Sequence, residues 1–181
     1  MNIIQDMKAY SGGNFVKSVL TLFFDPNFKA VLLYRQASYL HRQFNLQILP
    51  RMLRQHSRTF YSIDIDFRAI IGPGFKIVHG VGLVIGFDVT AGKNLVVYQG
   101  VTLGGNNGKK RIKGDREITQ PYLGNNCMIY TSAVIVGPVL VGDNSIIGAC
   151  SVITTDVPAN SMVYTKNETV YKSLKLQTDD V

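Results

Sequence analysis

Tryptophan is absent from this chain of 181 residues, and cysteine and histidine are rare, with two and three residues. Two cysteines cannot build the disulfide framework of a small secreted domain, and Cys127 and Cys150 lack the paired spacing of a cysteine zinc site. No apolar run approaches the about 18 residues of a membrane span, and the first residues lack a signal-peptide pattern. The chain is therefore expected to be cytoplasmic and to have no membrane span.

Acidic residues are also scarce, with 12 Asp and Glu against 19 Lys and Arg, so the net charge is +7. Such a charge favours a negatively charged binding partner: nucleic acid, an anionic membrane surface or a ligand with phosphate or carboxylate groups. Basic residues are spread over the first segment and one loop, and no nucleic-acid-binding motif occurs, so a nucleic-acid partner is not expected. An ordinary solvated surface explains the charge equally well.

Branched aliphatic residues recur every six residues along most of the chain. This period fits neither a helix, near 3.6 residues, nor a half-buried strand, near two. A six-residue repeat buries its apolar residue only by stacking on copies of itself, so the pattern predicts a triangular β-solenoid with one repeat per face. Evenly spaced strands of a sandwich are the alternative. The residues at this period are Ile65, Ile71, Ile77, Leu83, Val89, Leu95 and Val101, then Leu123, Ile129, Ile135, Val141, Ile147 and Ile153.

Glycine and other small residues accompany the repeat. Glycine follows the aliphatic residue where a tight corner needs a permissive backbone, and small residues precede it by two positions, where a corner leaves little volume. Both Cys127 and Cys150 are expected in the core for this reason. The glycines are Gly72, Gly124, Gly142 and Gly148, and the small residues are Ala69, Cys127, Ala133, Ser145 and Ser151.

The chain divides into three segments. Residues 1–60 lack the period of six, and apolar residues at three- and four-residue steps predict a helix over Phe28–Phe44, after a turn at Asp25-Pro26. The solenoid is predicted over residues 61–157. A polar tail is predicted over residues 158–181.

One insertion interrupts the solenoid. Val101 and Leu123 are twenty-two residues apart, which is not a multiple of six, so a loop is predicted at about residues 104–120. The loop is rich in glycine and lysine. A loop of this length inside a compact fold is expected to act as a lid or a binding loop, with a merely flexible insertion as the alternative.

Five short strings stand in order along the repeat: residues 64–66 (DID), 71–75 (IGPGF), 78–82 (VHGVG), 99–105 (QGVTLGG) and 147–152 (IGACSV). Together they resemble the hexapeptide-repeat acyltransferases and, among these, the serine-acetyltransferase-like branch. The resemblance spans most of the chain. It implies a mainly β fold, a left-handed parallel β-helix preceded by a short α-helical segment, and the transfer of an acetyl group from acetyl-CoA to a hydroxyl.

A histidine and an aspartate are the candidate catalytic residues. Asp64 precedes His79 by fifteen residues, so in coils of about eighteen residues it would lie nearly beneath it. An imidazole can take the proton of an attacking hydroxyl, and a carboxylate can orient it. The resemblance implies these roles for His79 and Asp64, with Asp66 as an alternative partner. A histidine that only caps a corner, with Asp64 as a turn residue, is the structural alternative.

A metal centre is not expected. The related γ-class carbonic anhydrases need three histidines around zinc, whereas His41 and His56 lie outside the repeats. Direct attack of the acceptor on acetyl-CoA also needs no enzyme nucleophile, in agreement with the lack of a serine-elbow or reactive-cysteine pattern.

The resemblance also implies contacts for both substrates. Acetyl-CoA is expected in the groove between neighbouring solenoids, and the acceptor near Asp25 and Arg116. A homotrimer is implied, because a short triangular prism has flat faces and the site needs walls from two chains; a hexamer of two trimers is the alternative. The positions expected to contact the coenzyme, whose small residues would equally suit corner packing, are Gly105, Thr131, Ser132, Gly148, Ala149 and Ser151.

Departures from the family pattern bear on the acceptor. Val78 stands where the family usually has an aspartate, and Glu117 follows Arg116 where it has a histidine. Because similar short members look like sugar O-acetyltransferases, a capsule or exopolysaccharide sugar is expected as the acceptor ahead of L-serine. A non-catalytic binding platform is a third hypothesis, which the presence of both Asp64 and His79 disfavours.

Overall fold

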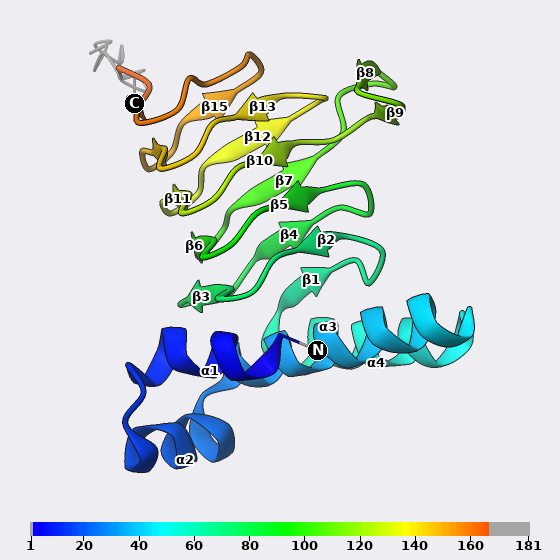
Figure 1. The fold of residues 1–181 in the computed structure, drawn as a ribbon, viewed down its shortest axis with the longest axis vertical. Coiled ribbons are helices and arrows are strands. Elements are labelled where there is room, and N and C mark those ends of the chain that lie inside the picture. The colour runs from blue at the N-terminus through cyan, green and yellow to red at the C-terminus, as the bar shows by residue number, and fades with distance from the viewer. Residues whose placement is uncertain (1, 167–181) are drawn as a thin grey trace, which may run out of the picture.

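The computed structural model describes residues 2–166, which form four helices followed by a stack of short parallel strands (Figure 1). The helices lie together at one end of the stack. Among the described residues, none of the helices has the length and apolar character to span a membrane. The helices are α1 (Ile3–Ser11), α2 (Phe15–Phe24), α3 (Pro26–Phe44) and α4 (Ile48–Tyr61).

The strands form three parallel sheets, one on each face of the coil, which confirms the predicted parallel β-helix. The first sheet contains β1 (Ile63–Ile65), β4 (Leu83–Ile85), β7 (Thr102–Gly104), β12 (Val134–Val136) and β15 (Val152–Ile153). The second contains β2 (Ile70–Ile71), β5 (Thr90–Ala91), β10 (Tyr122–Leu123) and β13 (Leu140–Val141). The third contains β3 (Lys76–Val78), β6 (Val96–Tyr98), β11 (Met128–Ile129), β14 (Ile146–Ile147) and β16 (Met162–Val163).

The last strand lies beyond the predicted end of the solenoid. β16 pairs in parallel with β14, so the third sheet continues to Val163. The expected boundary at residue 157 is therefore too early. The expected tail residues 167–181 lie outside the described residues.

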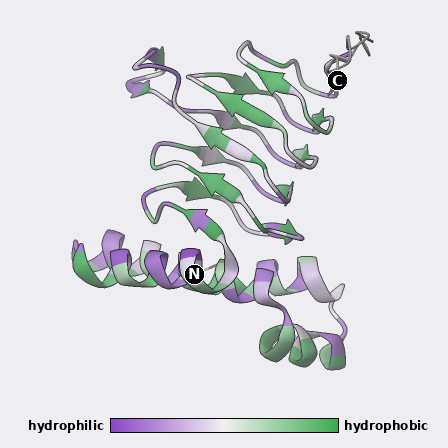
Figure 2. Cartoon of the chain, turned by 180° about the vertical axis from the view of Figure 1, so that it is seen from behind, coloured by the Kyte–Doolittle hydropathy of each residue, from purple (hydrophilic) through white to green (hydrophobic). Residues whose placement is uncertain are grey.

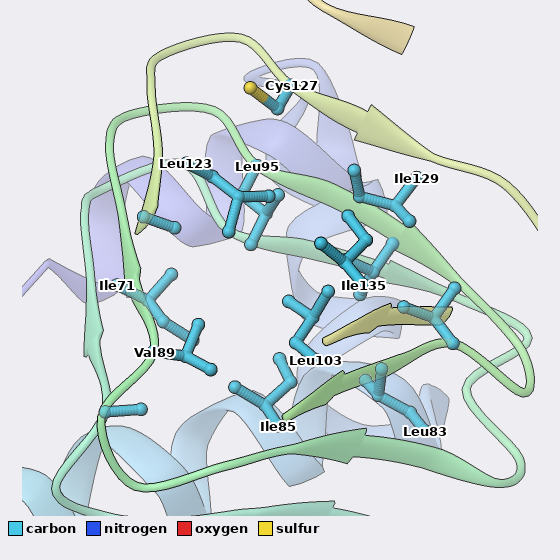
Figure 3. Close-up of a cluster of buried hydrophobic side chains, with 14 of the residues drawn as sticks. Ile71, Leu83, Ile85, Val89, Leu95, Leu103, Leu123, Cys127, Ile129 and Ile135 are labelled. Atoms are coloured by element: carbon cyan, nitrogen blue, oxygen red, sulfur yellow. The ribbon is translucent and has the colours of Figure 1, made fainter. Parts of the chain in front are cut away.

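Columns of aliphatic side chains fill the interior of the coil (Figure 3). In the first sheet Ile85 pairs with Leu103, and Leu103 with Ile135, and all three are fully buried. Because each coil covers the apolar residues of the coil below, burial is shared along the whole stack.

The first coil is two residues longer than the next. Ile65 pairs with Ile85, twenty residues later, whereas Ile85 pairs with Leu103, eighteen residues later. Leu83 therefore belongs to a second buried column, two positions before the first. The sequence period of six does not reveal this change of column, because both columns are apolar and the period continues across the insertion. The extra residues lie in the corner that carries His79.

A ladder of asparagines lines the corner between the second and third sheets. The Nδ2 group of Asn94 donates to Asn126 Oδ1 at 2.9 Å, and the next two rungs, to Asn144 and then to Asn160, are each 2.8 Å. All four have φ between 55° and 58°. Asparagine tolerates this left-handed backbone better than most residues, so it supplies the turn at this corner.

The small residues pack the corners as predicted, with one exception. All five positions are fully buried: Ala69, Cys127, Ala133, Ser145 and Ser151. Cys150, however, is exposed, so its predicted burial is wrong. Gly72 has no left-handed backbone. A Cβ atom there would lie 2.5 Å from the carbonyl oxygen of Gly92, so close approach of the next coil explains this glycine.

A buried ion pair joins the helices to the base of the solenoid. Arg35 Nε of α3 donates to Asp6 Oδ2 of α1 at 2.8 Å, and both side chains are buried. The same guanidinium donates to the carbonyl oxygens of Ile71 and Gly72 at 2.5 and 2.6 Å. Asp6 Oδ1 accepts from the Phe75 amide at 2.9 Å. One charged cluster therefore fixes two helices against the first coil.

Helix α2 packs differently: it is coloured mostly as hydrophobic in Figure 2, and most of its apolar side chains are exposed. Phe15 is 81% and Phe24 76% exposed, whereas the buried residue of this helix is Thr21. The face that contacts the protein is thus more polar than the exposed face.

The insertion after β7 forms an ordered antiparallel hairpin, β8 (Arg111–Lys113) and β9 (Arg116–Ile118). Ile118 is fully buried at its base. The hairpin lies within the loop predicted at about residues 104–120, and the hairpin itself was not predicted. Its signals in the sequence are the turn at Gly114-Asp115 and short strand-like stretches on either side.

Leu103→Ala should lower the free energy of unfolding by about 2–5 kcal/mol, because it leaves a cavity in a fully packed column. Leu103 is 0% exposed, whereas Val152 in the same sheet is 61% exposed. Val152→Ala is therefore the control, with an expected change within about 0.5 kcal/mol. Urea unfolding measures both, and equal losses would contradict the packing assignment.

Candidate active site

His79 lies in the lengthened corner between β3 and β4. It is exposed and adopts φ 52°, a conformation uncommon for a residue with a side chain. Its carbonyl oxygen accepts from the Val81 amide at 2.8 Å, which tightens the turn. The turn thus presents an imidazole at the edge between the third and first sheets.

The residue after the histidine fixes this turn from two sides. The Gly80 amide donates to Asn27 Oδ1 in the first turn of α3 at 2.8 Å. A Cβ atom on Gly80 would lie 2.5 Å from Ile77 Cγ2 and 2.6 Å from Ile63 Cδ1, so only glycine fits. Because Ile63 immediately precedes Asp64, the segments that carry the two candidate catalytic residues lie side by side.

Asp25 sits beside the same turn and caps α3. Its Oδ1 accepts from the amides of Asn27 and Phe28 at 2.8 and 3.2 Å, and Pro26 occupies the first helical position, as the predicted turn required. Since Asn27 reaches Gly80, the structure brings Asp25 near His79. Its contact with the acceptor stays a prediction.

The candidate partner Asp64 binds an arginine. Arg54 Nε of α4 donates to Asp64 Oδ1 at 2.6 Å, and Arg58 Nε lies 3.6 Å from Asp64 Oδ2. Within residues 2–166 no hydrogen bond joins Asp64 to His79. The predicted dyad is therefore adjacent but not bonded in the single chain, and sequence reasoning overlooked Arg54.

Asp66, the alternative partner, is buried among arginines. Its carboxylate accepts from Arg68 Nε and Nη2 at 2.8 Å each, and also from Arg54. Burial opposes the charged form, but the hydrogen bonds from Arg68 and the charges of Arg54 and Arg68 outweigh it and hold the pKa of Asp66 below its ordinary value. The geometry thus gives Asp66 a structural role.

The six positions expected to contact coenzyme A do not form one cluster. Gly105 follows β7 at the base of the hairpin, whereas Thr131, Ser132 and Ala149 lie at the corner between the third and first sheets. Ser132 and Ala149 are exposed there.

Two of these positions are packed by the chain itself. Ser151 is fully buried, and its hydroxyl accepts from the Thr165 amide at 3.0 Å. A Cβ atom on Gly148 would lie 2.9 Å from Tyr164 Cβ. The structure therefore gives both residues the packing role that the sequence left open as the alternative, and their contact with the coenzyme stays a prediction.

Aromatic and amide groups beside this corner were not predicted. The rings of Tyr98 and Tyr130 stack with centroids 5.0 Å apart on the third sheet. Gln99 Oε1, next in the chain, is buried and has no hydrogen-bond partner among the described residues. A buried acceptor of this kind normally has a donor, so a donor from a ligand or a neighbouring chain would satisfy it.

Arg116 lies near the opposite ends of the strands of the first sheet, at the corner between the first and second sheets. Its guanidinium pairs with Asp88, whose Oδ2 also accepts from the amide and hydroxyl of Thr119 at 2.6 and 2.9 Å. His79 precedes β4 and Asp88 follows it, so one chain does not bring Arg116 to His79.

Comparisons with known proteins agree with the fold and the repeat. Residues 121–155 match the family described as bacterial transferase hexapeptide (six repeats). A serine acetyltransferase of Helicobacter pylori is 38% identical over 155 residues, 85% of each chain. One from Synechococcus elongatus is 38% identical over 149 residues, 82% of this chain and 58% of that protein.

Solved structures show the same relationship. A crystal structure of serine acetyltransferase from Brucella abortus has a TM-score of 0.79 and 26% identity, and covers 92% of this chain and 65% of that one. A second, in complex with coenzyme A, has a TM-score of 0.78 and 28% identity, and covers 91% and 64%.

The coil and its matched repeats define a hexapeptide-repeat transferase. The chain belongs to the serine acetyltransferase family. It spans 58% of the length of the Synechococcus relative and 85% of the Helicobacter relative.

Asn27→Ala should lower kcat about fivefold, because loss of one neutral hydrogen bond, about 1 kcal/mol, loosens the turn that carries His79. Asn27→Asp keeps an acceptor for the Gly80 amide and should restore most of the rate. Equal rates for wild type and Asn27→Ala would remove this positioning role.

Proposed function

We propose that this protein transfers an acetyl group from acetyl-CoA to the hydroxyl of L-serine. The observation that carries the proposal is the match to the Helicobacter serine acetyltransferase over 85% of both chains. This order of acceptors reverses the expectation from the sequence, in which a sugar stood ahead of serine. The relatives outweigh the isolated substitutions at Val78 and Glu117.

The geometry supports His79 as the general base. Its imidazole is exposed on a turn held by Asn27 and by the packing of Gly80. The base takes the hydroxyl proton as the oxygen attacks the thioester carbonyl. Collapse of the intermediate then breaks the carbon–sulfur bond, and the imidazolium returns the proton to the departing thiolate. The products are an acetyl ester and free coenzyme A.

Asp64 remains the proposed orienting carboxylate. Its Oδ1 is held by Arg54, whereas the Arg58 contact to Oδ2, 3.6 Å, is too long for a hydrogen bond. That second oxygen is the one that could accept from an imidazole N–H. The arginine would then restrain the carboxylate while it orients His79.

A trimer would complete the site, and we include it in the proposal. In one chain His79 and Arg116 lie at opposite ends of the strands of the first sheet. A neighbouring solenoid must therefore bring its Arg116 close to a given His79. Acetyl-CoA would lie in the groove between the chains, near Ser132, Ala149 and the unpaired Gln99 Oε1. A trimer predicts a particle of three times the chain mass of 20.0 kDa, and a hexamer one of six times.

A glycan hydroxyl is the second candidate acceptor. Two residues expected near serine are bonded within the chain: Asp25 caps α3, and Arg116 pairs with Asp88. With Val78 in place of an aspartate, the described residues provide less charge for an amino acid than the family pattern does. This is the specific observation that keeps the sugar hypothesis.

His79→Ala should lower turnover by a factor of about a hundred or more, because no base then takes the hydroxyl proton. Coenzyme affinity, measured by calorimetry, should change little. His56→Ala removes an exposed imidazole from α4 and is the matched control, with turnover near wild type. Wild-type rates for His79→Ala would exclude the proposed mechanism.

Release of thiol from acetyl-CoA with different acceptors identifies the substrate. L-serine should give saturable turnover, and D-serine and a panel of sugars, nucleotide sugars and capsule fragments should give little. Turnover with a glycan alone would replace serine by the second candidate. No turnover with either class, together with no coenzyme binding, would favour a binding platform.

A further inference from the structure

An arginine-lined pocket separates α4 from the first corner of the solenoid. Its volume is about 280 Å³, and its lining is formed by Gln47, Arg51, Arg54, Gln55, Arg58, Phe67 and Arg68. The three arginines of α4 follow each other at steps of three and four residues, which places them on one face of the helix. Arg68 faces them from the corner after β1. This pocket is called the arginine pocket below.

Positive charge in the arginine pocket exceeds negative charge by two. Four guanidinium groups face two carboxylates, those of Asp64 and Asp66. Arg54 binds both carboxylates, and Arg68 binds Asp66 while its guanidinium lies 4.8 Å from the centroid of the Phe87 ring. These contacts account for two of the four arginines.

The other two arginines are less fully paired. Among the described residues the Arg51 side chain forms no hydrogen bond or ion pair, and Arg58 Nε lies 3.6 Å from Asp64 Oδ2. Both side chains are exposed, so they can reach a ligand from solvent. Gln47 and Gln55 also line the pocket; their Nε2 groups contact His41 Nδ1 and Thr59 Oγ1, each at 3.3 Å, and each amide has a second N–H to donate. A doubly charged anion would therefore balance the pocket and find several donors.

We propose that the arginine pocket binds a phosphate group. Guanidinium groups match the oxygens of phosphate with paired hydrogen bonds, and two uncompensated charges match a dianion. The phosphate could belong to a soluble phosphate ester or to a lipid headgroup, since both offer the same chemistry. Binding does not depend on the proposed acetyl transfer, so the two can fail separately.

The position of the pocket links it to the candidate active site. Arg54 and Arg58, which line the pocket, also contact Asp64. A phosphate that drew Arg58 away would weaken its contact with the carboxylate beside His79. The ligand would thus act on the site through a residue that the two share.

Binding of inorganic phosphate to the full chain, followed by calorimetry and by the melting temperature, tests the proposal. Saturable binding is expected, with a larger rise in melting temperature than sodium chloride gives at equal ionic strength. The double variant Arg51→Gln/Arg58→Gln should weaken the affinity about tenfold or more, because two charge-assisted contacts are lost.

A matched double variant controls for charge alone. Lys93→Gln/Lys109→Gln removes the same charge from two exposed positions on the solenoid and the inserted loop, and should bind phosphate as wild type does. Far-ultraviolet circular dichroism confirms that both variants fold. Wild-type affinity in the arginine variant, or a melting-temperature shift equal to that of chloride, would overturn the proposal.

Two further probes distinguish the sources of the phosphate. Tighter binding of glucose 6-phosphate than of inorganic phosphate would support a soluble ester. Arginine-dependent binding to phosphatidic acid vesicles, without binding to phosphatidylcholine vesicles, would support a headgroup. Binding to either vesicle that the arginine variant leaves unchanged would contradict the site.

Discussion

Stacking of each coil on the next is the interaction on which the rest of the structure depends. A single repeat cannot cover its own aliphatic residue, so Ile85, Leu103 and Ile135 are buried only as members of a column. Parallel backbone hydrogen bonds hold the coils in register, and the asparagine ladder holds one corner. Because the strands on the faces must pack in register, extra residues are accommodated at the corners, where two residues or a whole hairpin are inserted.

The candidate active site follows from two such changes. Two extra residues lengthen the corner of the first coil and present His79. Leu103 pairs with Ile135 thirty-two residues later instead of eighteen, and the fourteen extra residues include the hairpin that carries Arg116. The helices then act on the first change: Asn27 holds the histidine turn, and Arg54 holds Asp64. The end of the solenoid that meets the helices is thus where catalysis and the arginine pocket are expected.

Much of the fold could be predicted because its signal is local and repeated. The period of six predicted the coil, and the dipeptide Asp25-Pro26 predicted the start of α3. The columns were harder, because Leu83 continues the period while belonging to another column. Cys150 was predicted as buried because it is a small residue inside the repeat, but it lies at an exposed left-handed corner.

The candidate site was predictable in its residues but not in their contacts. The sequence strings around Asp64 and His79 identify both residues. The arginines of α4 that form ion pairs with the aspartates lie outside the six-residue repeat, so the sequence does not link them to the coil. Gln99 Oε1 likewise could not be singled out from the sequence, because its lack of a hydrogen-bond partner among the described residues depends on what surrounds it in space.

The sequence by itself determined the coil, the kind of residue in each column and the place of the inserted loop. The reason is that each repeat is buried by stacking on its neighbours, which requires an apolar residue at a regular spacing along the chain. Only the tertiary structure decided how the helices meet the first coil: Arg35 with Asp6, Asn27 with Gly80, and Arg54 with both aspartates. The physical reason is that each of these contacts joins charged or amide groups that are distant in the chain, and each occurs only once. No periodic sequence pattern therefore predicts them.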